Sequence, residues 1–208
     1  MSVAEDIIEK ARTLFDEVGV ARDPDTGDTT IVLGLVTTPE RDLDDFVNDG
    51  VHSIMRGFER HARHREDALL DFVRGRGYEA ELVGELGYSP SGRPNLKHLA
   101  VAAGLGKQGK NTVVISPDHG PWLRFMAIRT NAPLTLTGPG EYSRGENPYC
   151  ADCQRCVDAC PVGIILPYRV VDTGKCLAAI TEDRRGELAI CEDCVVACPV
   201  GQRKPRVP

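Results

Sequence analysis

The cysteines are the residues of this sequence whose type and spacing most clearly predict chemistry. All eight lie between residues 150 and 198 of a 208-residue chain. Two segments, CQRCVDACPVG (153–163) and CEDCVVACPVG (191–201), are identical at eight of eleven positions, including three cysteines and a proline. In a chain without an export signal, such crowding predicts metal binding, and the alternative is a tail held by disulfides.

The spacing of the first cysteine run predicts iron–sulfur clusters. The residues from Cys150 to Pro161 follow the pattern C-x2-C-x2-C-x3-C-P. This is the bacterial ferredoxin run, in which three cysteines bind one [4Fe–4S] cluster and the fourth binds the other. The second run contributes Cys191, Cys194 and Cys198, with Cys176 as a detached first ligand.

We therefore predict two [4Fe–4S] clusters with crossed ligation, which use every cysteine once. The expected ligands of the first cluster are Cys150, Cys153, Cys156 and Cys198, and those of the second are Cys160, Cys176, Cys191 and Cys194. Paired zinc sites are the alternative metal hypothesis. Zinc requires neither the x2-x2-x3 spacing nor the proline, so the iron–sulfur hypothesis accounts for more of the pattern.

The composition predicts a soluble globular protein. Apolar residues make up 41% of the chain and charged residues 27%. The net charge of −6 provides no general attraction for nucleic acid, so we do not expect a nucleic-acid partner. Apolar runs such as 31–36 are too short to span a bilayer, and the first residues lack the features of a secretory signal. We expect a cytoplasmic location and no membrane partner.

Helical and strand-like patterns alternate before residue 140, where the apolar periodicity fails. We expect helices at 3–19 (closed by Gly19), 42–74 (with a break near 49–50 left open) and 95–106, and strands at 29–38, 78–85, 112–117 and 122–130, the last two joined by a hairpin-like DHGP. The expected fold class is α+β. It combines an α/β domain at 1–140, for binding a cofactor or partner, with a ferredoxin-like double [4Fe–4S] domain at 141–208.

The segment 96–134, together with the two cysteine runs, resembles the epoxyqueuosine reductase family and its relatives the reductive dehalogenases. The resemblance implies a cobalamin-binding α/β domain before a two-cluster ferredoxin domain, and hence cobalamin as a further cofactor. In the family, the segment matching AGLGKQGKN approaches the corrinoid ring. The implied cofactor-binding residues are Gly104, Gly106, Lys107, Gly109, Lys110 and Asn111. A helix C-cap followed by a tight turn is the alternative role of these glycines.

The sequence departs from the family pattern at several positions. Family reductases usually have tryptophan and isoleucine where this chain has Lys107 and Gln108. Their proton-donating aspartate is missing, because Ser91 or Gly92 falls at its place. The N-terminal part that completes the corrinoid pocket is shorter here, and the tRNA-reading helical repeats are absent. We therefore do not expect epoxyqueuosine reduction itself.

Candidate proton donors are Tyr88, Ser91 and His98, for which a turn residue or a helix-surface histidine is the alternative role. Three functional hypotheses remain. We favour an iron–sulfur oxidoreductase in which two clusters relay electrons to a cofactor or substrate at the N-terminal domain. The second hypothesis is an electron-transfer or accessory protein that serves a partner enzyme, and the third is an iron–sulfur redox sensor. The expected redox partner is a ferredoxin- or flavodoxin-type donor, or an acceptor enzyme.

Overall fold

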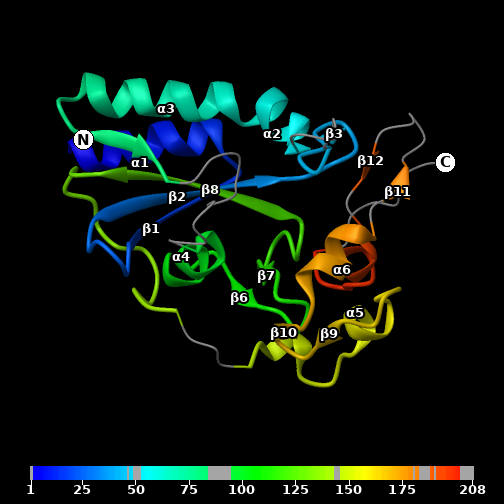
Figure 1. Cartoon of the computed structure of the whole chain (residues 1–208). Coiled ribbons are helices and arrows are strands. Elements are labelled where there is room, and N and C mark those ends of the chain that lie inside the picture. The colour runs from blue at the N-terminus through cyan, green and yellow to red at the C-terminus, as the bar shows by residue number, and fades with distance from the viewer. Residues whose placement is uncertain are drawn as a thin grey trace. The chain divides into compact units, whose positions relative to one another are not determined.

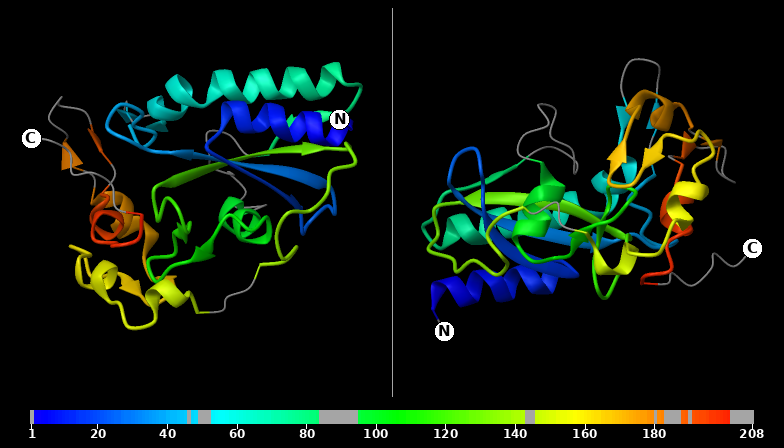
Figure 2. Two further views of the ribbon diagram at one scale, coloured as in Figure 1. Left: turned by 180° about the vertical axis from the view of Figure 1, so that it is seen from behind. Right: turned by 90° about the horizontal axis from the view of Figure 1, so that it is seen from below.

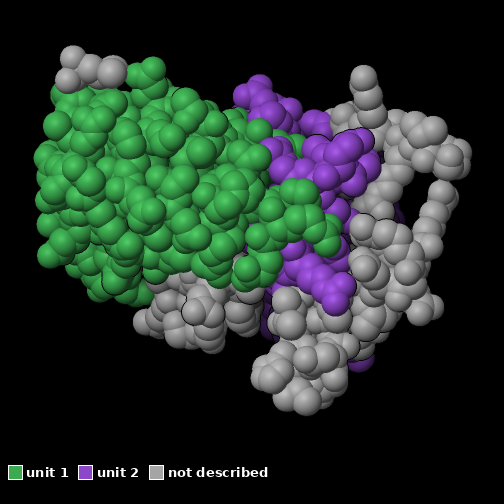
Figure 3. All heavy atoms as spheres, turned by 90° about the horizontal axis from the view of Figure 1, so that it is seen from above, with its two compact units in different colours: residues 1–36, 59–106, 124–143 green, residues 37–58, 107–123, 144–208 purple. Residues whose placement is uncertain are grey.

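The computed structural model describes residues 2–45, 47–48, 53–83, 95–142, 146–179, 181–182, 188–189 and 191–201. It contains two compact units, coloured separately in Figure 3. The first unit consists of residues 1–36, 59–106 and 124–143, and the second of residues 37–58, 107–123 and 144–208. The last division lies close to the boundary expected near residue 140, and the second unit also includes two earlier segments.

The first unit has three layers with a four-stranded sheet in the middle. The sheet order is β1 (Glu17–Arg22), β2 (Thr29–Val36), β8 (Leu123–Thr130) and β5 (Ala80–Leu82), with antiparallel pairing of β1 with β2 and of β5 with β8. Helices α1 (Val3–Leu14) and α3 (Arg63–Gly75) pack together on one face, and α4 (Leu96–Ala102) covers the other (Figures 1 and 2). The α+β fold class is confirmed.

The apolar patterns explain why this unit forms. A capping box between Ser2 and Glu5 begins α1, and the buried Ile7 and Ala11 lie on its inner face. The run of buried residues in β2 is covered on both sides of the sheet, which is why it reads as a continuous apolar stretch. These residues are part of the buried core of the first unit.

The helix expected at 3–19 ends earlier than predicted, at Leu14, and Gly19 lies in strand β1. The glycine was interpreted as a helix stop signal, but the structure uses it for close packing. A Cβ atom at Gly19 would lie 2.8 Å from the carbonyl oxygen of Ala103 and 2.9 Å from its Cβ. Glycine therefore allows the end of α4 to pack directly on β1.

The long helix expected at 42–74 was also wrong. Residues 56–75 contain two helices, α2 (Arg56–His61) and α3, and the preceding segment contains a short antiparallel ribbon of β3 (Val47–Asn48) and β4 (Ser53–Ile54). The Thr37 hydroxyl accepts a hydrogen bond from Leu43 N at 3.1 Å, and the Asp42 carboxylate accepts one from Asp44 N at 3.1 Å. Such side-chain bonds to the backbone compete with helix formation.

The second unit is built from short elements. They are β6 (Lys107–Gln108), β7 (Val114–Ile115), the 3-10 turn η1 (Pro148–Cys150), α5 (Arg155–Asp158), β9 (Ile165–Leu166), β10 (Arg169–Val170), α6 (Thr173–Ala178), β11 (Thr181–Glu182), β12 (Leu188–Ala189) and α7 (Asp193–Val196). The two strands expected around DHGP do not pair with each other, because β7 pairs with β6 and β8 joins the four-stranded sheet. DHGP instead lies at a single bridge between Ser116 and Gly120.

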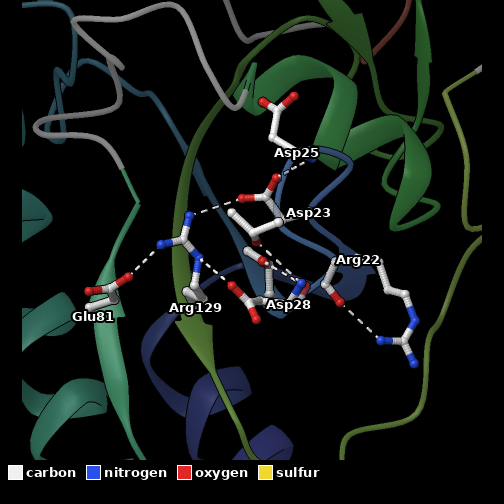
Figure 4. Close-up of polar contacts among 9 residues, drawn as sticks. Arg22, Asp23, Asp25, Asp28, Glu81 and Arg129 are labelled. Carbon is white, nitrogen blue, oxygen red and sulfur yellow. Dashed lines mark hydrogen bonds and ion pairs between the residues drawn. The ribbon is translucent and has the colours of Figure 1, made fainter.

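Arg129 on β8 joins the polar turn between β1 and β2 to strand β5 through ion pairs (Figure 4). Its guanidinium lies 3.0 Å from the Asp23 carboxylate and 3.4 Å from that of Asp28, and it also pairs with Glu81. Asp23 is only 1% exposed, and its hydrogen bond is the main cause that raises the pKa of Arg129. The polar turn is thus fixed by a partly buried charge network. Among the described residues, no helix has the length and apolar character needed to cross a membrane.

Candidate iron–sulfur site

The repeated cysteine sequence folds in the same way twice. One copy contains the one-turn helix α5, and the other contains α7. The peptide NH of Cys160 donates to Val157 O at 3.3 Å, and the equivalent bond runs from Cys198 N to Val195 O at 3.1 Å. Gly163 and Gly201, which end the copies, have φ angles of +61° and +62°. The sequence repeat is therefore a structural repeat.

Helices α5 and α7 pack against each other (Figure 2). Near this contact lies a first group of cysteines, which consists of Cys150, Cys153, Cys156 and Cys198. Burial raises the pKa of the Cys156 thiol, and the charges of Cys150, Cys153 and Cys198 raise it further. Burial also raises the pKa of Cys198, with smaller contributions from Cys150 and Cys153. Cys198 thus lies near Cys150, Cys153 and Cys156.

A second group of thiols lies around Cys194. Burial raises the pKa of Cys194 to about 11, against a lowering effect of its hydrogen bond with Asn111, and the charges of Cys156, Cys176 and Cys191 contribute to the increase. Burial also raises the pKa of Cys160, but hydrogen bonds from the backbone at 162–165 outweigh this effect and lower it overall. Cys176, Cys191 and Cys194 therefore lie near one another. The neighbours that the structure shows for Cys160 are backbone NH groups.

All eight cysteines are free thiols, so the structure contains no disulfide between them. Within the described residues, no three cysteine, histidine or acidic side chains are arranged to hold a single metal ion. A [4Fe–4S] cluster does not require that arrangement, because each thiolate binds a different iron at a corner of the cube. The donor set fits clusters by its chemistry, since four thiolates are the usual ligands of one cube.

Of the residues expected to contact cobalamin, Gly104 and Gly106 lie in the first unit. Gly104 follows α4 with a φ of +80° and completes a Schellman motif, in which Gly104 N bonds to Val101 O and Leu105 N to Ala100 O. A Cβ at Gly104 would lie 3.0 Å from the Cα of Gly138. The close backbone approach at Gly104 is therefore made by the chain itself. Gly106 has a φ of +152°.

The other four expected cofactor residues lie in the second unit, on the β6–β7 hairpin. Lys107 is exposed, and a Cβ at Gly109 would lie 2.8 Å from the Ile115 side chain. Lys110 is buried, and its Nζ donates to Cys153 O at 2.9 Å and to Ala151 O at 3.2 Å. Asn111 is also buried and donates from Nδ2 to Cys194 O at 3.2 Å. Both side chains contact the cysteine loops.

Of the three candidate proton donors, the structure describes His98 alone. Tyr88 and Ser91 lie outside the described residues. The His98 ring, on α4, stacks on Tyr142 with 3.8 Å between the ring centroids and 20° between the planes. The structure thus places His98 in an aromatic pair within the first unit.

Comparison with known proteins gives a consistent result. No family model matches the chain. It is 41% identical over 101 residues to an epoxyqueuosine reductase of Synechocystis sp., a match that covers 49% of this chain and 33% of that protein. Over about half of its length the chain is therefore similar to epoxyqueuosine reductases. The match nevertheless spans only about a third of the length of this curated relative.

Solved structures of an epoxyqueuosine reductase and of a reductive dehalogenase share the fold. The epoxyqueuosine reductase of Streptococcus thermophilus superposes with a TM-score of 0.66 at 17% identity, over 97% of this chain and 66% of that one. A reductive dehalogenase whose reaction is described as B12-dependent dehalogenation superposes with a TM-score of 0.68 at 18% identity, over 96% of this chain and 32% of that one. At these identities the likeness establishes the fold.

Asn147 supports the first cysteine loop, a role that the sequence by itself did not reveal. It is fully buried, donates from Nδ2 to Lys107 O at 3.0 Å, and accepts from Tyr149 N at 3.0 Å. It thereby caps η1, which carries Cys150, and holds it to the β6 strand. The available signal was the Asn-Pro dipeptide, a turn initiator, placed three residues before the first cysteine.

Proposed function

We propose that this chain is an iron–sulfur oxidoreductase that holds two [4Fe–4S] clusters with crossed ligation. The ligands of one cluster are Cys150, Cys153, Cys156 and Cys198, and those of the other are Cys160, Cys176, Cys191 and Cys194. When bound, such clusters supply one-electron transfer to a substrate, a further cofactor or a partner protein. The observation that best supports the proposal is the place of Cys198 beside Cys150, Cys153 and Cys156.

The chain's own residues support this role by holding the thiols on short, repeated loops. The α5–α7 contact brings the two copies together, and in each copy the NH of the last cysteine, Cys160 or Cys198, bonds back to a carbonyl of the helical turn. The backbone donors at 162–165 favour the thiolate form of Cys160, which is the form that binds iron. The assignment of Cys160 to the second cluster remains a prediction from the ferredoxin pattern.

Anaerobic purification followed by iron and acid-labile sulfide analysis tests the proposal. We expect a brown protein with about eight irons and about eight sulfides per chain, as two cubes require. The electron paramagnetic resonance (EPR) spectrum should appear on reduction with dithionite. Two zinc atoms per chain without labile sulfide would overturn the proposal in favour of paired zinc sites.

Cobalamin is a second candidate cofactor, supported by the family and by the B12-dependent dehalogenase with the same fold. Against this, Gly104, Lys110 and Asn111 make contacts within the chain that a corrinoid contact would have to replace. Titration of the reduced protein with cob(II)alamin, followed by visible spectra, distinguishes the hypotheses. A saturable spectral change supports a corrinoid-dependent reductase, and its absence supports an electron-transfer protein that serves a partner enzyme.

A further inference from the structure

Lys110 is a buried cation in the loop between β6 and β7, with only 7% of its surface exposed. Its ammonium donates to two main-chain carbonyl oxygens, those of Ala151 and Cys153, and within the described residues no carboxylate pairs with it. Burial of an uncompensated ammonium is costly, so a site that retains one must provide other negative charge. The two carbonyl dipoles supply only part of that compensation.

The missing negative charge has an obvious source in the proposed clusters. Ala151 and Cys153 belong to the loop that begins with Cys150, and Cys150 and Cys153 are proposed ligands of the first cluster. A cube bound by four thiolates carries a net negative charge, which increases by one on reduction. The reduction potential of a cluster depends on net charge, hydrogen bonding and burial. A buried cation under this loop therefore favours the reduced form.

The neighbouring residue, Asn111, contacts the second copy of the repeat. Its Nδ2 donates to Cys194 O at 3.2 Å, and its Oδ1 accepts from Val113 N at 3.2 Å, which fixes the amide orientation. Asn111 is 4% exposed and carries no charge. Thr112 follows with a φ of +66°, an uncommon conformation for a residue other than glycine, and this tight turn belongs to the hairpin loop. One loop thus contacts both cysteine copies, with a cation on one side and an amide on the other.

We infer that residues 109–113 position the two cysteine loops and set the two clusters at different reduction potentials. The inference rests on the proposed function. Lys110 is a positioning residue for the loop of Cys150 and Cys153, and its charge raises the potential of the first cluster. Asn111 holds Cys194 by a neutral hydrogen bond, so the second cluster lacks this increase. The difference in potential gives electrons a preferred direction along the chain.

The test is an EPR-monitored redox titration of the anaerobically purified full chain and its Lys110→Met variant. We expect the midpoint potential of the first cluster to fall, with an at least tenfold change in its reduced-to-oxidised ratio at a fixed potential, about 59 mV for one electron. The second cluster should shift much less. Lys107→Met is the matched control, because it removes the same charge from an exposed position on the same hairpin. A Cys156→Ser variant identifies the signal of the first cluster.

Unchanged potentials in Lys110→Met with both clusters present would overturn the inference, as would equal shifts in Lys107→Met. Selective loss of the first cluster supports the positioning role. If Lys110→Met fails to fold, Lys110→Gln keeps an amide donor for the carbonyls without the charge. A lowered potential in that variant supports the inference, and an unchanged one overturns it. If the wild-type chain contains no iron and sulfide, the proposed function fails and the inference fails with it, which the metal analysis reveals before any titration.

Discussion

Gly120 and Gly201 approach each other so closely that neither position has space for a Cβ atom. A Cβ on Gly201 would overlap the backbone of His119 and Gly120, and one on Gly120 would overlap the backbone of Val200. Both residues have positive φ angles, +56° and +62°. The turn that contains DHGP therefore covers the end of the second cysteine copy. The equivalent residue of the first copy, Gly163, has nothing within 4 Å of its Cβ position.

The two equivalent glycines should therefore respond differently to the same substitution. Gly163→Ala meets only the strain of a positive φ, which costs about 1–2 kcal/mol of unfolding free energy. Gly201→Ala meets the same strain plus steric overlap with backbone, which adds about 1–3 kcal/mol. Anaerobic denaturant titration of both variants measures the difference. Equal losses in the two variants would contradict the close contact between Gly120 and Gly201.

Crossed ligation predicts which cysteine variants resemble each other. Cys198→Ala should damage the cluster bound by Cys150, Cys153 and Cys156, because Cys198 lies among these three thiols. Its EPR spectrum should therefore match that of Cys156→Ala and differ from that of Cys194→Ala. Cys160→Ala should match Cys194→Ala instead. If each variant matched its own sequence copy, the crossed arrangement would be wrong.

Removal of Arg129 should destabilise the first unit. Arg129→Leu leaves Asp23, which is 1% exposed, with a buried charge and no guanidinium partner. Breaking such a pair costs about 3 kcal/mol, the lower end of the range, because the Arg129 side chain is itself 26% exposed. Arg22→Leu is the control, since the Arg22 side chain donates to Gly27 O at an exposed position and its loss should cost under about 1 kcal/mol. Thermal unfolding of both variants measures this difference, and similar melting temperatures would refute it.

Glu66 should make stability depend on pH near neutrality. It is 3% exposed, and burial raises its pKa from 4.5 to about 7. The charge of Arg63 lowers this pKa, and the charges of Asp67 and Glu59 raise it by smaller amounts. Because the folded pKa lies above the unfolded one, the unfolded chain releases this proton first as the pH rises. The contribution of Glu66 to the free energy of unfolding is therefore fully present below about pH 4.5. It decreases by about 3 kcal/mol as the pH rises through 7.

The Glu66→Gln variant removes that titration while it keeps the shape of the side chain. The free energy of unfolding, measured by denaturant at several values between pH 5 and 8, should fall with pH in the wild type and much less in the variant. Asp71→Asn, on the exposed side of the same helix, is the control and should retain the wild-type slope. A wild-type slope in Glu66→Gln would refute the role of Glu66.

The sequence by itself predicted iron–sulfur chemistry for the second unit and several main elements of the first. Cysteine spacing is a local pattern, since short spacers and a proline fix which thiols can meet on one cube, so the ligand prediction needed no tertiary information. The continuous apolar run of β2 and the capped, amphipathic α1 are likewise local signals that the structure retains. Both elements begin where the pattern placed them, and both end earlier than predicted.

The roles of residues whose partners are distant in the chain could be read only from the folded structure. Gly19 looked like a helix stop until Ala103, 84 positions later, was seen packed against it. Lys110 and Asn111 looked like residues that could reach a corrinoid, but their polar atoms bond to Cys153 and Cys194. Glycine, lysine and asparagine each serve many contacts equally well, so their local sequence does not specify a partner. Burial determines the hydrogen-bond partner, because a buried amide or ammonium must bond to an oxygen that the fold brings within reach.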